Sequence, residues 1–194
     1  SREPGNYQGV APDADLIVVK LKGAGTFYRD LYLVPPEQEN AYESSDLMLG
    51  IEYAIKKAVE MNRPISFCIS LGTNLGGHDG SSILEESLSR LSYLPGVSIC
   101  TAAGNEAIAR HHMMGSVAQV GDTYDIGVIS GDNEAPIYMS IINNAPDLLS
   151  VSIISPNGEV LERIPAQSGI TFESGFVLER SSVIVRYFFP VELT

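Results

Sequence analysis

Short apolar runs alternate with amphipathic segments along residues 9–110, and this alternation most constrains the fold of the chain. Three apolar runs have the length of a strand: residues 16–19, Ile65–Ile69 and Val97–Thr101. Between them, residues 44–58 and 82–91 carry apolar side chains at helical spacing. Strands that alternate with helices are typical of a parallel sheet with crossover helices. The sequence therefore predicts an α/β fold with at least three parallel strands, ending near residues 20, 70 and 101.

Local signals predict where the two helices begin and end. Residues 44–46 supply cap candidates for the first helix, and Asn62-Arg63-Pro64 ends it. Ser82 and Glu85 have the spacing of a capping box, and Pro95-Gly96 follows the second helix.

The pattern changes after residue 114. Strand-like runs separated by turn residues replace the helical spacing, and Asn157-Gly158 between two of them is a strong hairpin signal. We predict an antiparallel β-sandwich in residues 115–194, after an α/β core in residues 1–114. The predicted runs are residues 124–129, 137–142, 148–154, 159–164 and 183–189.

A long insertion occupies residues 22–44 between the first apolar run and the first helix. It contains Gly23-Ala24-Gly25 and Pro35-Pro36, which favour loops. The residues predict a surface loop with a short hairpin.

Small residues and an asparagine follow the apolar run Val97–Thr101. The stretch Ala102-Ala103-Gly104-Asn105-Glu106 places a carboxamide at the carboxyl end of a predicted parallel strand, where ligands bind in open α/β sheets. A carboxamide can donate a hydrogen bond to a developing oxyanion. Glycine and asparagine also tolerate a positive φ, so a plain turn is the alternative.

Four blocks in order resemble the subtilisin-like serine proteases (subtilases). They are Gly-Val-Ala-Pro at 9–12 with the following apolar run to Lys20, Gly-Ile-Glu-Tyr-Ala-Ile at 50–55, Ser-Leu-Gly at 70–72, and Ala-Ala-Gly-Asn-Glu at 102–106. The resemblance implies a subtilisin-like parallel sheet and an endopeptidase that hydrolyses peptide bonds. It implies that Asn105 is the catalytic oxyanion donor and that two walls bind substrate, made of Ser70, Leu71, Gly72 and of Ala102, Ala103, Gly104. For the insertion it implies, as the alternative to a surface loop, a region that follows an edge strand paired with the substrate backbone.

The same resemblance identifies what the chain lacks. A subtilase uses Asp, His and Ser as orienter, general base and nucleophile. Neither the family's His-Gly-Thr motif nor its Gly-Thr-Ser-Met motif occurs in the 194 residues. We therefore expect a central fragment of a protease, inactive by itself. The alternatives are a subtilase-like pseudoprotease and a β-sandwich binding module that acts as a sensor or scaffold.

Two further stretches resemble large bacterial subtilases, including the germination-associated ones. The sequence around Ser155-Pro156-Asn157-Gly158 is similar to a hairpin of their jelly-roll domains, and residues 104–112 are similar to their Gly-Asn-Glu…His-His segment. The resemblance implies a jelly roll inserted after the oxyanion strand. It also implies a secreted, cell-envelope or spore-associated location.

Charge and composition limit the partners. The net charge of −12 argues against binding to nucleic acid. The sequence contains no run of about 18 apolar residues, so no membrane-spanning helix is predicted. The expected partner is a peptide or protein substrate.

No cofactor and no metal are predicted. His111 and His112 are adjacent and so point in different directions, and His78 is predicted to be a solvated loop residue. Acidic turns at 121–122 and 131–134 could offer oxygen ligands to calcium but lack EF-hand spacing.

Two cysteines, Cys68 and Cys100, lie inside the predicted strands. We predict buried, reduced thiols, with a cross-strand disulfide as the alternative.

Overall fold

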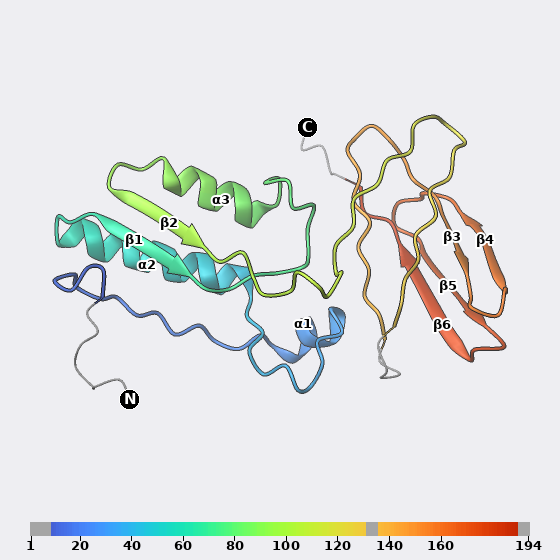
Figure 1. The fold of residues 1–194 in the computed structure, drawn as a ribbon, viewed down its shortest axis with the longest axis horizontal. Helices are drawn as coiled ribbons and strands as arrows, with labels where there is room; N and C mark the ends of the chain where they lie inside the picture. Colours follow the sequence, from blue (N-terminus) through green and yellow to red (C-terminus); the bar gives the residue numbers. More distant parts are fainter. Residues whose placement is uncertain (1–8, 131–135, 190–194) are drawn as a thin grey trace. The chain divides into compact units, whose positions relative to one another are not determined.

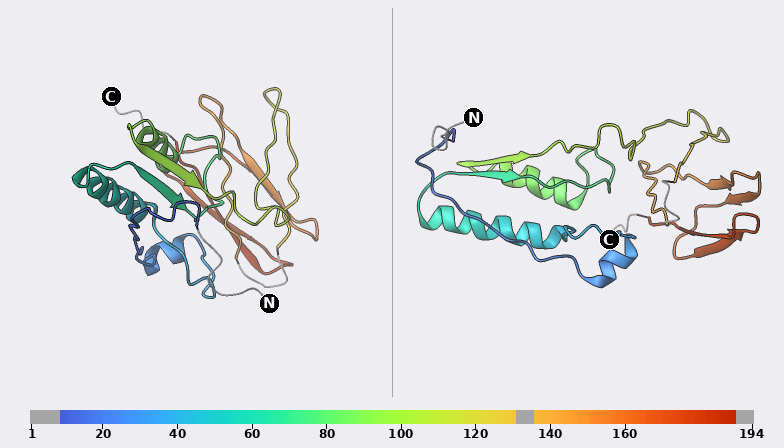
Figure 2. Two further views of the ribbon diagram at one scale, coloured as in Figure 1. Left: turned by 60° about the vertical axis from the view of Figure 1, so that its left-hand side comes forward. Right: turned by 60° about the horizontal axis from the view of Figure 1, so that its bottom comes forward.

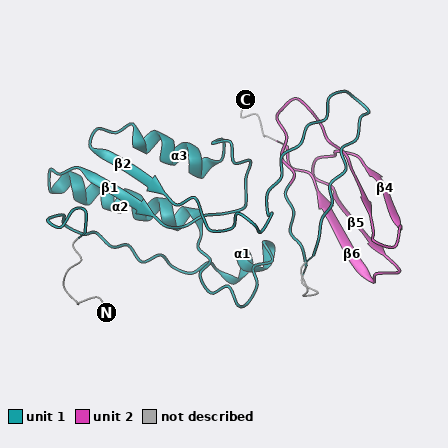
Figure 3. Cartoon of the chain, in the orientation of Figure 1, with its two compact units in different colours: residues 1–140 teal, residues 141–194 magenta. Residues whose placement is uncertain are grey.

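A computed structural model describes residues 9–130 and 136–189 of the chain. The chain divides into two compact units, Ser1–Ser140 and Ile141–Thr194, and each is described by itself (Figure 3). Helices and strands are both present, as expected for an α/β chain. The predicted domain boundary between residues 114 and 115 stays a prediction.

The first unit contains three helices and two paired strands (Figure 1). Strands β1 (Ile65–Ile69) and β2 (Val97–Thr101) are parallel, with Ile65 opposite Val97 and Ile69 opposite Thr101. Helix α3 (Ile83–Ser92) is the crossover between them, as predicted. The other helices are α1 (Thr26–Leu31) and α2 (Ser44–Glu60).

The apolar residues of these elements face the helices. Both α2 and α3 lie on one side of the β1–β2 pair (Figure 2). Helix α2 buries Ile51, Ala54 and Ala58 at the predicted helical spacing. In β1, burial alternates from residue to residue and ends at the buried Ile69, the pattern of a strand covered on one face.

One helix start was predicted correctly and one was not. Ser82 and Glu85 form the predicted capping box, in which each side chain meets the other residue's backbone N–H, at 3.3 Å and 3.2 Å. Helix α2 starts after Glu43, and no side chain caps it, so the cap predicted at residues 44–46 is wrong. Glu43 instead accepts a hydrogen bond from the backbone N–H of Gly25 at 3.2 Å.

The third parallel strand, predicted at residues 16–19, is not formed. These residues have no strand partner among the described residues, and a strand requires one. The segment still alternates as an extended chain does, with Leu16 and Val18 nearly fully exposed and Ile17 and Val19 less so. A Cβ added at Gly50 of α2 would meet the Val19 side chain at 2.9 Å, so the segment packs on that helix.

The two cysteines are exposed, which contradicts the predicted burial. Cys68 and Cys100 are register partners on neighbouring strands and remain free thiols. Both lie on the sheet face opposite Phe67 and Ile99, the face that α2 and α3 do not cover.

The insertion at residues 22–44 contains a helix that the sequence analysis missed. Helix α1 lies between Gly23 and Tyr42, which form an antiparallel bridge. Within the described residues, this bridge is the only part of the predicted hairpin. The Arg29 guanidinium donates to the carbonyl oxygens of Pro35 and Gln38, at 3.2 Å and 2.9 Å, and so closes the loop after α1.

The second unit contains two antiparallel hairpins. Strands β3 (Val151–Ile154) and β4 (Val160–Ile164) pair, as do β5 (Thr171–Phe176) and β6 (Ser181–Arg186). Asn157-Gly158 lies in the β3–β4 turn, as predicted, and Gly158 has a φ of 85° that favours glycine. The sandwich itself stays a prediction.

Strand positions in the second half were predicted only in part. The predicted runs at residues 124–129 and 137–142 form no strand in the described chain, whereas β5 was not predicted. Within the described residues, no helix combines the length and apolar character that crossing a bilayer requires.

Replacing Gly175 by alanine tests the β5–β6 pairing. A Cβ at this position would lie 2.6 Å from the backbone carbonyl oxygen of Ser181, so the two strands must move apart. We expect a cost of about 1–3 kcal/mol and a loss of amide hydrogen-exchange protection in β6 of roughly tenfold or more. Gly127→Ala is the matched control, because its Cβ would meet nothing within 4 Å. Unchanged β6 protection in Gly175→Ala would contradict the pairing.

Candidate functional site

The carboxyl ends of β1 and β2 bring two predicted site segments together. The strands are in register to their last residues, and the backbone N–H of Ala102 donates to the Ile69 carbonyl oxygen at 3.0 Å. Residues 70–72 and 102–105 therefore leave the sheet at the same edge. Parallel pairing alone produces this arrangement, because parallel strands end on the same side.

Both segments are open to solvent. Residues 70–72 and 102–105 are all exposed. An added Cβ at Gly72 would meet nothing within 4 Å, so the space beside its backbone is free. Gly104 has a φ of 80°, which an L-residue adopts only at a cost, and this explains a glycine directly before Asn105.

Asn105 lies where the sequence predicts it, directly after the exposed residues that follow β2. Across residues 9–130 and 136–189, no hydrogen bond engages its carboxamide. An exposed carboxamide of this kind keeps its two N–H donors for water or a ligand.

A polar network beside Asn105 was missed by the sequence analysis. Glu106 Oε2 accepts a hydrogen bond from Asn74 Nδ2 at 2.8 Å and lies 3.0 Å from His111 Nδ1. Asn74 Nδ2 is also 3.2 Å from that ring nitrogen. The hydrogen bonds from Asn74 and then from His111 hold the pKa of the Glu106 carboxyl below its ordinary value.

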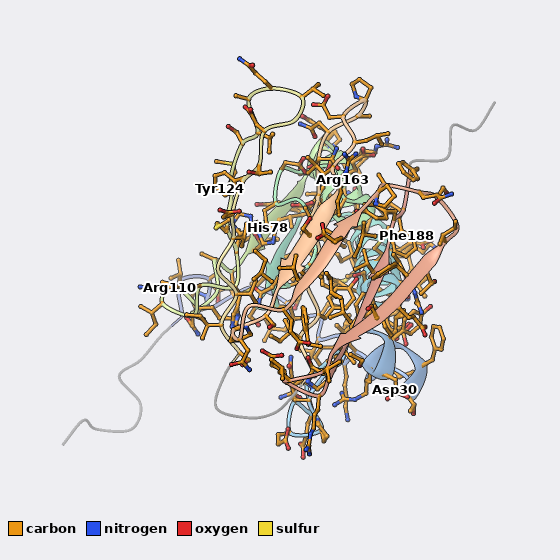
Figure 4. The ribbon with its side chains drawn as sticks, turned by 90° about the vertical axis from the view of Figure 1, so that its right-hand side faces the viewer. Asp30, His78, Arg110, Tyr124, Arg163 and Phe188 are labelled. Carbon is orange, nitrogen blue, oxygen red and sulfur yellow. The ribbon has the colours of Figure 1, made fainter. Side chains whose placement is uncertain are left out.

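The remaining histidines meet next to this network. The rings of His78 and His112 lie 4.6 Å apart, centroid to centroid, with 30° between their planes. His78, labelled in Figure 4, belongs to the loop after β1, and His112 belongs to the segment after β2. His78 is an exposed loop residue, as predicted, and its ring also lies beside that of His112. The signal available in the sequence was that all three histidines follow the two strand ends.

The described residues contain no group of three or more side chains of the kinds that ligate metals. The Asp122 carboxylate accepts a hydrogen bond from the backbone N–H of Gln119 at 3.1 Å and so stabilises its own turn. The other acidic turn considered for calcium, at 131–134, lies outside the described residues.

Serines close to the strand ends are engaged in local structure. The Ser81 hydroxyl donates to Asp79 Oδ1 at 2.5 Å, and the same oxygen accepts from the Ser81 backbone N–H at 3.0 Å. The Ser82 hydroxyl caps α3. Neither hydroxyl is hydrogen-bonded to a histidine, the arrangement that activates a serine nucleophile.

Comparison with solved structures supports a relationship to a protease. The chain resembles the CspB protease of Clostridium perfringens, with a TM-score of 0.57 and 27% sequence identity. The similarity covers 79% of this chain but only 32% of the CspB protease, so the chain spans about a third of that protein. No family model matches the chain, and no curated protein matches it.

Titration of Glu106 tests the polar network. Because its pKa is lowered, the carboxylate form stabilises the network above the ordinary pKa of 4.5, and this contribution is lost as the pH falls through the lower pKa. We expect the Glu106 side-chain carbon signal, followed by NMR, to titrate with a midpoint below 4.5 in the wild type and higher in Asn74→Ala. A wild-type midpoint at or above 4.5 would contradict the network.

Proposed function

We propose that this chain is a central part of a subtilisin-like serine endopeptidase and that its site binds an extended peptide. One observation carries the proposal: the Ser-Leu-Gly and Ala-Ala-Gly-Asn segments leave β1 and β2 side by side. Their exposed backbones and small side chains leave room for a peptide backbone on both sides. The similarity to the CspB protease supports the same class of activity.

In this proposal, Ser70, Leu71 and Gly72 form one wall of the substrate site. A peptide in extended conformation would exchange backbone hydrogen bonds with this segment, as in strand addition to a sheet edge. Ala102, Ala103 and Gly104 form the opposite wall, which receives the side chain that precedes the scissile bond. Because these residues are small, the proposed pocket admits a large apolar or aromatic side chain.

Asn105 supplies the oxyanion donor. When a nucleophile attacks the scissile carbonyl, the carbonyl oxygen gains negative charge, and a fixed N–H donor stabilises this charge more than it stabilises the ground state. The exposed carboxamide of Asn105 is suited to this role. The general base, its orienting aspartate and the serine nucleophile would come from parts of the parent protein outside these 194 residues.

The finer fold belongs to the same proposal. The parallel pair β1–β2 with α2 and α3 would be part of a larger subtilisin-like sheet. The hairpins β3–β4 and β5–β6 would belong to an inserted jelly-roll domain.

A subtilase-like pseudoprotease is the second candidate. None of the three histidines stands in a His-Gly-Thr sequence, and no Gly-Thr-Ser-Met occurs. Sequencing the flanks of the parent gene separates the two candidates. Intact triad motifs on both sides support the endopeptidase, whereas substituted triad positions support a pseudoprotease.

The parent protein carrying Asn105→Ala tests the catalytic role. Loss of one oxyanion donor acts on the transition state, so we expect kcat to fall by roughly 10²–10³-fold while KM stays nearly constant. Peptide hydrolysis at several substrate concentrations measures both constants. A kcat within a few-fold of the wild type would make Asn105 a turn residue.

Gly72→Phe in the same parent protein provides the contrasting variant. The open space beside Gly72 lies on the proposed path of the peptide, so a large side chain there should mainly raise KM. Opposite effects of the two variants on kcat and KM would separate substrate binding from oxyanion stabilisation.

A further inference from the structure

We propose that five side chains form a loop clamp that positions Asn105. The loop clamp consists of Asn74 and His78 in the loop after β1, and of Glu106, His111 and His112 in the segment after β2. It is a positioning device, since none of its members is assigned contact with the reacting atoms. Its effect on catalysis rests on the proposed function, whereas its effect on the conformation of Asn105 does not.

The first contact of the loop clamp fixes the residue next to Asn105. The Glu106 carboxylate meets Asn74 at 2.8 Å, from across the site, and His111 at 3.0 Å, from five residues further along its own segment. A carboxylate held from two directions restricts the backbone that carries it. Since Glu106 directly follows Asn105, the same contacts limit the directions in which the Asn105 carboxamide can point.

The second contact lies between the same two segments. The centroids of the His78 and His112 rings lie 4.6 Å apart, and the ring planes are tilted by 30°. A single hydrogen-bonded contact lets two loops rotate about it, whereas two contacts at different positions oppose that rotation. The loop clamp thus links the two segments that follow the proposed substrate walls. Both of its contacts lie beyond the last backbone hydrogen bond of the sheet, from Ala102 to Ile69.

The backbone near the loop clamp adopts conformations that non-glycine residues rarely adopt. His78 has a φ of 54°, and Arg110, directly before His111, has a φ of 56°. The left-handed region is unfavourable for an L-residue because its Cβ comes too close to the following carbonyl oxygen. Such conformations persist where surrounding contacts hold them and gather at functional sites. Both residues, labelled in Figure 4, belong to the two segments that the loop clamp joins.

Exposure limits how much each contact stabilises the fold. The side chains of His111 and Glu106 are 55% and 57% exposed, so their contact contributes little to global stability. A contact that stabilises little and lies beside a candidate catalytic residue is better explained by local orientation. The loop clamp should therefore affect the site much more than the unfolding of the chain.

NMR of the 194-residue chain tests the loop clamp without any activity measurement. We expect His111→Ala and Asn74→Ala each to shift and broaden the Asn105 side-chain amide signals, and the double variant to do no more than either alone, because both act through Glu106. His111→Asn, which can place an N–H donor near the position of Nδ1, should restore most of the wild-type spectrum. Unchanged Asn105 signals in both single variants, or additive changes in the double variant, would overturn the proposal.

Arg90→Gln is the matched control for these variants. It removes an exposed ion pair of the same unit, Arg90 with Glu86 at 3.1 Å, which lies within α3. We expect it to leave the Asn105 signals unchanged. A shift of the same size in this variant would mean that any loss of surface charge perturbs Asn105, and it would overturn the specific role of the loop clamp.

Kinetics of the parent protein test the consequence for catalysis. We expect His111→Ala to lower kcat by roughly tenfold with little change in KM, since a displacement of 1 Å in a catalytic group can cost about 10²-fold, and we expect His111→Asn to recover most of it. A kcat equal to the wild type with shifted Asn105 signals would overturn the catalytic consequence. If the wild-type parent hydrolyses no peptide, the proposed function fails, and the NMR measurement alone decides on the loop clamp.

Discussion

The parallel pairing of β1 and β2 is the interaction on which the rest of this site depends. Five register pairs, from Ile65 opposite Val97 to Ile69 opposite Thr101, align the two strand ends. The hydrogen bond from Ala102 to Ile69 extends that alignment by one residue. A shift of one residue would reverse the faces of one strand and move one exposed segment away from the other. The candidate site is thus a consequence of strand register.

The helices fix that register from one side only. The buried residues of α2 and the half-buried residues of β1 and β2 form an apolar layer, whereas Cys68 and Cys100 face solvent. A parallel sheet is usually covered on both faces. The extended residues 16–19, which pack on α2 without a strand partner, fit the same picture of a partial sheet.

Features that depend on local sequence were predictable, and those that depend on contacts with distant parts of the chain were not. Helix α2, the capping box at Ser82 and the Asn157-Gly158 turn follow from spacing and turn chemistry. The strand at residues 16–19 and the burial of the cysteines failed because each requires a further layer or strand. Strand β5 was missed since Gly175 weakens its alternating pattern, although the glycine is required by the close approach of Ser181.

The candidate site shows the same division. The positions of Ser70–Gly72 and of Ala102–Asn105 at strand ends follow from the sequence, because parallel strands end on the same side. The network of Asn74, Glu106 and His111 does not, since its members are up to 37 residues apart and meet only through the backbone path of two loops. Contacts between loops depend on exact backbone conformation, such as the positive φ of His78, which residue type alone does not predict.

In the proposed function, a serine outside these residues completes a peptidase site on this chain. Labelling with a serine-directed fluorophosphonate tests it most directly, applied in parallel to the parent protein and to the 194-residue chain, with the modified residue located by mass spectrometry. The account predicts stoichiometric labelling of one serine in the parent, outside residues 1–194, and none in the isolated chain. Labelling of Ser81, Ser82 or Ser116 in the isolated chain, or no labelling of the parent, would contradict it.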